Sequence, residues 1–154
     1  MIAEGQKAPE FTLQTNGSNS ISLSDYRGKN AVVLYFYPKD DTPGCTKEAC
    51  SFRDTQSEFG KLDTVVLGVS ADSVRSHEKF AEKFHLPFPL LADEDKSVNQ
   101  AYGVWKEKSM YGKTYLGTER TTFVIDKEGV IRKIFPKVNV EIHIDEVLAF
   151  VRTL

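Results

Sequence analysis

Two runs of β-branched and aromatic residues dominate the pattern of hydrophobic and polar positions along the chain. Residues 31–37 and 64–70 are almost continuously apolar, which is typical of strands in a sheet that is covered on both faces. Turn-forming residues separate shorter alternating runs and predict hairpins. The further strands are predicted at 88–91, at 121–126 and 130–135 as one hairpin, and at 11–14 and 20–23 as another around Asn16-Gly17.

Helices are predicted between these strands from apolar residues that recur every three or four positions. In residues 73–84 the stripe includes His77, which is therefore interpreted as a packed helix residue rather than a ligand. The other helices are predicted from Thr42 or Pro43 to about Phe59, over 96–102, and at the C-terminus along Ile144, Val147, Leu148 and Val151.

The order of these elements predicts the fold class. Strand, helix, strand and helix are followed by a hairpin and a helix, which indicates a mixed three-layer α/β arrangement in one domain, residues 1–154. The helix that begins near Thr42 leaves the carboxyl end of a central strand, where α/β folds place their sites.

Composition and charge exclude several classes of protein. The net charge of −2 does not suggest a nucleic-acid surface. There is no long apolar stretch and no secretory signal at residues 1–5, so no membrane association and a reducing cytoplasmic compartment are expected. Only two cysteines are present, and His77, His85 and His143 form no closely spaced set, so no metal site is expected.

Cys45 occupies a position that favours a reactive thiol. Thr42 is a good N-cap residue type and Pro43 suits the first helical position, so Cys45 falls among the unpaired N–H groups of the first turn. These groups and the helix dipole stabilise negative charge, and the thiolate is the nucleophilic form of cysteine. The alternative is that Cys45 is a small buried hydrophobic residue, as most free cysteines are.

Cys50 lies on another side of the same predicted helix. It shares a face with Arg53, Asp54 and Ser57, where a structural cysteine has little reason to be. On an ideal helix the two cysteines are ~140° apart around the axis and their Cα atoms roughly 8.7 Å apart, beyond the ~7 Å that a disulfide can bridge. A disulfide between them would therefore require the first helical turns to unwind.

The segment around the cysteines resembles a known family. Pro38, Thr42 and Cys45 fit the P-x-x-x-T-x-x-C signature of the peroxiredoxins, and a second cysteine at Cys50 is similar to the bacterioferritin-comigratory, or PrxQ, subfamily. The segments 5–11, 102–105, 111–115 and 120–126 agree with it. The resemblance spans almost the whole chain and implies a thioredoxin-like fold with an N-terminal β-hairpin.

The resemblance implies a thiol-specific peroxidase with an antioxidant role that reduces hydrogen peroxide and organic hydroperoxides. Cys45 would be the peroxidatic cysteine and form a sulfenic acid; Cys50 would resolve it to an intramolecular disulfide. Thioredoxin would reduce that disulfide, and no metal or organic cofactor would be required. The chain lacks the features of the dimeric two-cysteine peroxiredoxins, so a monomer is expected.

The resemblance also implies roles for four further residues, each with a simpler alternative. Arg120 would stabilise the thiolate and hold the peroxide, although arginine is usually a surface charge. Thr42 would hydrogen-bond the peroxide, or only cap the helix. Pro38 would shield the thiolate from water, or only end the strand. Glu48 would orient Arg120, or only complement the helix dipole.

Two other functions compete with a peroxidase. A disulfide carrier or reductase on the same fold usually has a C-x-x-C pair, whereas the cysteines here are separated by four residues. A non-catalytic binding module would simply bury Cys45. The aromatic residues Tyr102, Trp105, Tyr111 and Tyr115 are expected to pack rather than to take part in chemistry.

Overall fold

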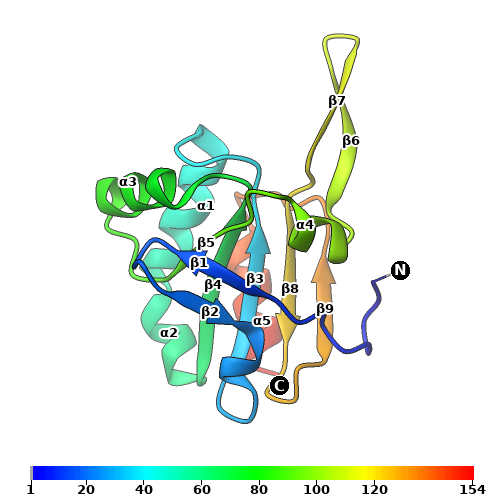
Figure 1. The fold of residues 1–154 in the computed structure, drawn as a ribbon. Coiled ribbons are helices and arrows are strands. Elements are labelled where there is room, and N and C mark those ends of the chain that lie inside the picture. The colour runs from blue at the N-terminus through cyan, green and yellow to red at the C-terminus, as the bar shows by residue number, and fades with distance from the viewer. Residues whose placement is uncertain (1) are drawn as a thin grey trace.

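A seven-stranded mixed β-sheet forms the centre of the computed structural model, which describes residues 2–154 (Figure 1). The strand order is β2-β1-β5-β4-β3-β8-β9. Strands β3, β4 and β5 run parallel, while β8 pairs antiparallel with β3. The strands of this sheet are β1 (Thr12–Thr15), β2 (Ser20–Ser22), β3 (Ala31–Phe36), β4 (Thr64–Ser70), β5 (Leu90–Ala92), β8 (Thr121–Ile125) and β9 (Ile131–Phe135).

Helices cover both faces of the sheet, as the α/β prediction requires. The helices are η1 (Leu23–Tyr26), α1 (Pro43–Asp54), α2 (Gln56–Lys61), α3 (Val74–Phe84), α4 (Ser97–Ala101) and α5 (His143–Val151). Successive side chains of β3 point to opposite faces of the sheet and so contribute to both hydrophobic cores. Val33 and Tyr35 pack in the cluster with α1, α2, α3 and α5, whereas Leu34 and Phe36 pack in the cluster with α4, η1 and the N-terminal segment.

Most of the predicted elements are confirmed, because strands and helices that bury a face leave a clear pattern. The predicted helix from Thr42 to about Phe59 is wrong in its continuity. It breaks at Thr55, whose hydroxyl donates to the carbonyl of Ser51 at 2.7 Å and whose backbone N–H turns back to Phe52. Both cysteines lie in α1, before this break.

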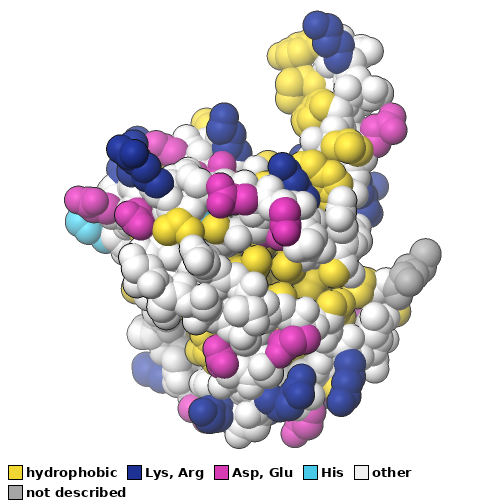
Figure 2. All heavy atoms as spheres, in the orientation of Figure 1, with side chains coloured by type: hydrophobic (Ala, Val, Ile, Leu, Met, Phe, Trp, Pro, Cys, Tyr) yellow, Lys and Arg dark blue, Asp and Glu magenta, His cyan; other side chains and the backbone are white. Residues whose placement is uncertain are grey.

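The sequence analysis missed a two-stranded hairpin, β6 (Trp105–Met110) and β7 (Lys113–Thr118), which projects away from the sheet (Figure 1). Its turn, Tyr111-Gly112, has positive φ at both residues, as a tight two-residue hairpin requires. Figure 2 shows hydrophobic and basic side chains mixed along it. Because both faces of this hairpin are close to solvent, its sequence need not alternate between apolar and polar residues. The hydrophobic pattern therefore did not predict it.

Within residues 2–154, no helix is both long enough and apolar enough to cross a membrane.

Candidate active site

Cys45 lies in the first turn of α1, where the chain leaves the carboxyl end of β3, and its side chain is 1% exposed. Thr42 is the N-cap residue: its backbone is extended and its carbonyl accepts from the Thr46 N–H at 2.8 Å. Its hydroxyl, however, donates to the carbonyl of Lys39 at 2.9 Å and makes no capping bond. The first N–H groups of α1 therefore have no side-chain cap from Thr42 and can face an anion near Cys45.

Arg120 reaches Cys45 because of the strand order. It precedes β8, and Thr121 pairs with Phe36 at the carboxyl end of β3, so Arg120 lies beside the start of α1. Its Nη2 donates to the Cys45 Sγ at 3.3 Å. A guanidinium keeps its charge at any pH of interest, so a permanent positive charge lies beside the Cys45 sulfur.

Glu48 holds the other side of the same guanidinium. Arg120 Nη1 donates to Glu48 Oε1 at 2.7 Å, and Glu48 is 1% exposed. Burial raises the pKa of the Glu48 carboxyl to about 7, although Arg120 acts in the opposite direction. Glu48 Oε2 has no hydrogen-bond partner among residues 2–154. The chain thus aligns Cys45, Arg120 and Glu48 in one buried group.

Gly44 provides the space that Arg120 occupies. A Cβ built on Gly44 would lie 3.2 Å from Arg120 Nη2, which is tighter than an ordinary contact. The guanidinium therefore lies directly over the helix start, where a larger residue at position 44 would displace it.

Cys50 lies one to two turns further along α1 and is half-buried, and both cysteines are free thiols. Arg53, the residue with which it was predicted to share a face, follows three positions later on α1; a hydrogen bond to Asp54 raises the pKa of Arg53. Because Cys45 and Cys50 share one continuous helix, the spacing argument applies to the structure. Pro38 is half-buried in the turn between β3 and α1.

The aromatic residues divide into two groups. Tyr102 is buried and packs against Phe36 and Phe123, as expected. For Tyr111 and Tyr115 the packing prediction is wrong, because Tyr111 is 96% exposed at the tip of the β6–β7 hairpin and Tyr115 is also exposed. Both residues belong to the hairpin that projects from the sheet, so the main core does not cover their rings.

Sequence reasoning missed two features close to this site. Lys108 of β6 donates to the carbonyl of Thr118 at 2.7 Å. Burial and the neighbouring Arg120 lower the pKa of Lys108, with Cys45 acting in the opposite direction, so Lys108 adds positive charge near the thiol. Lys108 was missed because the hairpin that carries it was not predicted.

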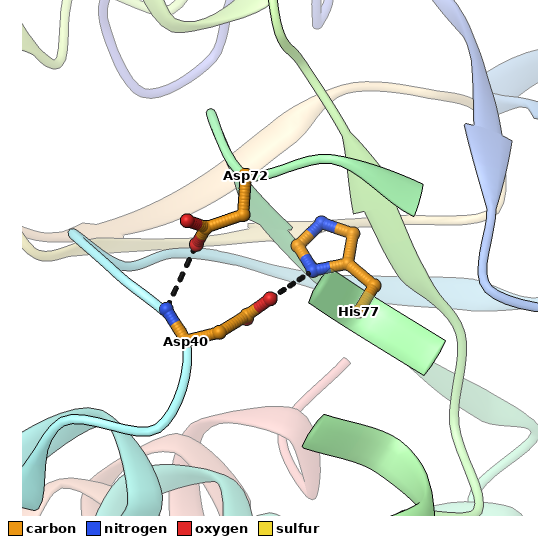
Figure 3. Close-up of side chains that lie close together, drawn as sticks. All are labelled: Asp40, Asp72 and His77. Atoms are coloured by element: carbon orange, nitrogen blue, oxygen red, sulfur yellow. Dashed lines mark hydrogen bonds and ion pairs between the residues drawn. The ribbon is translucent and has the colours of Figure 1, made fainter. Parts of the chain in front are cut away.

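The second missed feature is a buried cluster beside the loop that precedes α1, made of Asp40, Asp72 and His77 (Figure 3). Their potential ligand atoms lie within 4.8 Å of one another. Those atoms are already engaged in hydrogen bonds: Asp72 Oδ2 accepts from the Asp40 N–H, and Asp40 Oδ2 lies 2.7 Å from His77 Nδ1. We therefore interpret the cluster as a hydrogen-bonded network and assign no metal to it. His77 is buried in α3, as its stripe predicted.

Replacing Arg120 by lysine is expected to slow oxidation of Cys45 by about tenfold or more, although the charge is kept. The guanidinium contacts Cys45 and Glu48 through two different nitrogens, and a single ammonium cannot reproduce both contacts. The measurement is the second-order rate constant for thiol oxidation by peroxide in stopped flow. Arg132→Lys is the matched control, because Arg132 is half-exposed and pairs with Asp126, which lies at the opposite end of β8 from Arg120. An unchanged rate constant in Arg120→Lys would show that the guanidinium of Arg120 is not required for oxidation of Cys45.

Comparison with known proteins places the chain among thiol peroxidases. The model of the AhpC/TSA family matches residues 4–134. The peroxiredoxin Bcp of Bacillus subtilis is 52% identical over 96% of this chain and 93% of its own length. A cysteine-to-serine mutant of PrxQ from Xylella fastidiosa superposes with a TM-score of 0.94 at 38% identity, over 99% of this chain and 97% of the other.

A further structural relative is the bacterioferritin comigratory protein of Xanthomonas campestris, described for its alkyl peroxide reduction activity. It gives a TM-score of 0.88 at 42% identity and covers 93% of this chain and 90% of its own. These structures confirm the thioredoxin-like fold and the subfamily that the cysteine signature indicated.

Proposed function

The chain belongs to the AhpC/TSA family, as a peroxiredoxin of the Bcp/PrxQ type, and from this membership we propose how its own two cysteines carry out peroxide reduction. It is a peroxidase, an oxidoreductase that acts on peroxide as electron acceptor. The observation that supports its site best is the contact of 3.3 Å between Arg120 Nη2 and Cys45 Sγ at an uncapped helix start.

In the first step, the Cys45 thiolate attacks the nearer oxygen of a peroxide, and the O–O bond breaks. The sulfur becomes a sulfenic acid, and the leaving oxygen departs as water or an alcohol after it takes a proton. Arg120 stabilises the thiolate and the developing negative charge on the oxygens. Thr42 donates its hydroxyl hydrogen to Lys39, so its lone pairs are free to accept a hydrogen bond from the peroxide O–H.

Two neighbours prepare this step without reacting. Glu48 fixes the guanidinium through the 2.7 Å bond to Nη1, so that Nη2 points at the sulfur. Pro38 has no N–H and lies at the turn before α1, where we propose that its ring limits access of water to the thiolate. Both residues are positioning groups.

In the second step, the first turns of α1 unwind and the Cys50 thiol condenses with the sulfenic acid. A disulfide forms between Cys45 and Cys50, and water leaves. An external dithiol protein, which we propose is thioredoxin, then reduces the disulfide by thiol–disulfide exchange and becomes oxidised itself. Each chain holds both cysteines, so the cycle needs no second copy.

Hydrogen peroxide and organic hydroperoxides are the proposed substrates, and the cytoplasm is the proposed compartment. The alkyl peroxide reduction for which the Xanthomonas campestris relative is described supports the organic substrates. The presence of only two cysteines, both used in the proposed cycle, suits a reducing compartment.

Mass spectrometry before and after one equivalent of peroxide tests the proposed cycle. The protein is expected to lose two hydrogens and both free thiols, with a peptide map that joins Cys45 to Cys50. Thioredoxin with its reductase should then support continuous peroxide consumption. A protein that reduced an insulin-type disulfide but not peroxide would be a carrier, and retention of both thiols would contradict the cycle.

A further inference from the structure

The loop of residues 38–42, here called the pre-helix loop, is fixed at its middle residue. Asp40 is 7% exposed, and its carboxylate accepts from the Tyr37 hydroxyl at 2.6 Å and from the Ser76 hydroxyl at 2.8 Å. Its backbone N–H donates to Asp72 Oδ2 at 2.8 Å (Figure 3). His77 Nδ1 lies 2.7 Å from Asp40 Oδ2. Asp40 therefore joins the loop to the residue after β3, to the segment between β4 and α3, and to α3 itself.

The partners of His77 hold its ring in one orientation. The ring is fully buried, and its Nε2 lies 2.9 Å from the backbone carbonyl of Leu91, which can only accept a hydrogen bond. Its Nδ1 faces the Asp40 carboxylate, which is also an acceptor. Both ring nitrogens of His77 therefore have a buried hydrogen-bond partner, and the ring cannot turn without losing both contacts. Loss of either member of the Asp40–His77 pair would leave a buried polar group without its partner.

The proposed cycle requires a boundary between the part of the chain that unwinds and the part that stays. α1 begins without a side-chain cap from Thr42, so its first turn opens by breaking backbone hydrogen bonds alone. Moving Asp40 would instead break four hydrogen bonds, one of them the buried contact with His77. Unwinding therefore costs the least free energy if it stops between Asp40 and Pro43.

We propose that the Asp40–His77 pair is the fixed N-terminal end of the segment that unwinds, and that His77 is a positioning residue for Thr42 and Cys45. This inference rests on the proposed function, because it concerns the cycle of Cys45 and Cys50. The pair holds the pre-helix loop in place while the helix start opens and lets the site re-form after reduction. It acts on the peroxide step through the placement of Thr42, two residues beyond Asp40.

Hydrogen exchange on the reduced and disulfide forms of the wild-type protein tests the boundary without any substitution. The amide of Asp40 is expected to stay protected in both forms, while the hydrogen-bonded amides of residues 46–50 lose protection on oxidation. If the disulfide forms and the Asp40 amide exchanges as fast as those of α1, the pair is not the fixed end. If no Cys45–Cys50 disulfide forms at all, the proposed function fails instead.

Variants test the positioning role. In His77→Gln and in Asp40→Asn, the rate of Cys45 oxidation by peroxide is expected to fall by about tenfold or more, because small misplacements of reacting groups are costly. Formation of the disulfide from the sulfenic acid should not slow down, since a looser loop does not hinder unwinding. A general loss of stability would lower the melting temperature but would not separate the two steps in this way.

Lys83→Gln is the matched control. Lys83 also comes from α3 and bonds the pre-helix loop, through Asp41 at 2.9 Å, but both side chains are exposed. Its loss is expected to change both rates by less than about twofold. If His77→Gln does not fold, Asp40→Asn carries the test. Unchanged peroxide rates in a folded variant, or equal slowing of both steps, would overturn the positioning role.

Discussion

Replacement of Cys45 by serine is expected to abolish peroxide turnover, with a loss of at least about a thousandfold. The hydroxyl of serine is not ionised near neutral pH, so Arg120 would face a neutral oxygen in place of a thiolate. The fold should persist, because serine differs from cysteine by one atom and fits the same buried space. Peroxide consumption with a thioredoxin system is the measurement, and the melting temperature is the control for folding.

Any activity above a trace in Cys45→Ser would assign the nucleophile to another group. Cys50 is the only other thiol of the chain, and it is half-buried and lies five residues after Cys45 on α1. The double variant Cys45→Ser with Cys50→Ser would identify it as the source of such activity.

Replacement of Cys50 by serine is expected to stop turnover after about one equivalent of peroxide, because the sulfenic acid at Cys45 then has no thiol partner within the chain. The first oxidation should keep its wild-type rate, since Cys50 does not contact the buried group around Arg120. Rapid-quench mass spectrometry should find one added oxygen on Cys45, followed by further oxidation at excess peroxide.

A small external thiol is expected to restore slow turnover to Cys50→Ser by attacking the sulfenic acid directly. Cys45→Ser is the contrasting control, because no thiol can rescue a protein without a nucleophile. Turnover with thioredoxin at the wild-type rate would show that Cys50 is not the resolving residue.

The elements that bury a face could be predicted from the sequence, while those that face solvent could not. β3 and β4 are apolar on both sides, so their limits were recognised to within one residue. The β6–β7 hairpin packs on neither side along most of its length, and its Tyr111-Gly112 turn is less distinctive than Asn-Gly. The break in the predicted helix lies at Thr55, whose hydroxyl bonds the carbonyl of Ser51. The spacing of apolar residues contains no information about such a bond.

The site shows the same division between local and distant information. The helix start at Cys45 follows from neighbouring residues, and the structure has it where the sequence placed it. The capping role of Thr42 does not hold, because its hydroxyl donates to Lys39 instead. Contacts across long sequence separations, such as Arg120 with Cys45 and Asp40 with His77, depend on the order of strands in the sheet. That order is a property of the folded chain as a whole.

The burial of Glu48 links the redox cycle to protons. In the reduced protein this carboxyl has a pKa of about 7, against an ordinary value of 4.5, because burial disfavours its charge. Unwinding between Cys45 and Cys50 carries Glu48 into water, where it ionises normally. Because the pKa of Glu48 is raised in the reduced, folded form, protonation of Glu48 stabilises that form. This stabilisation is fully present below pH 4.5 and is lost as the pH rises through about 7. Disulfide formation would therefore release a proton from Glu48 between pH 4.5 and about 7. Raising the pH through this range would favour the oxidised enzyme, in addition to the effect of pH on the two thiols.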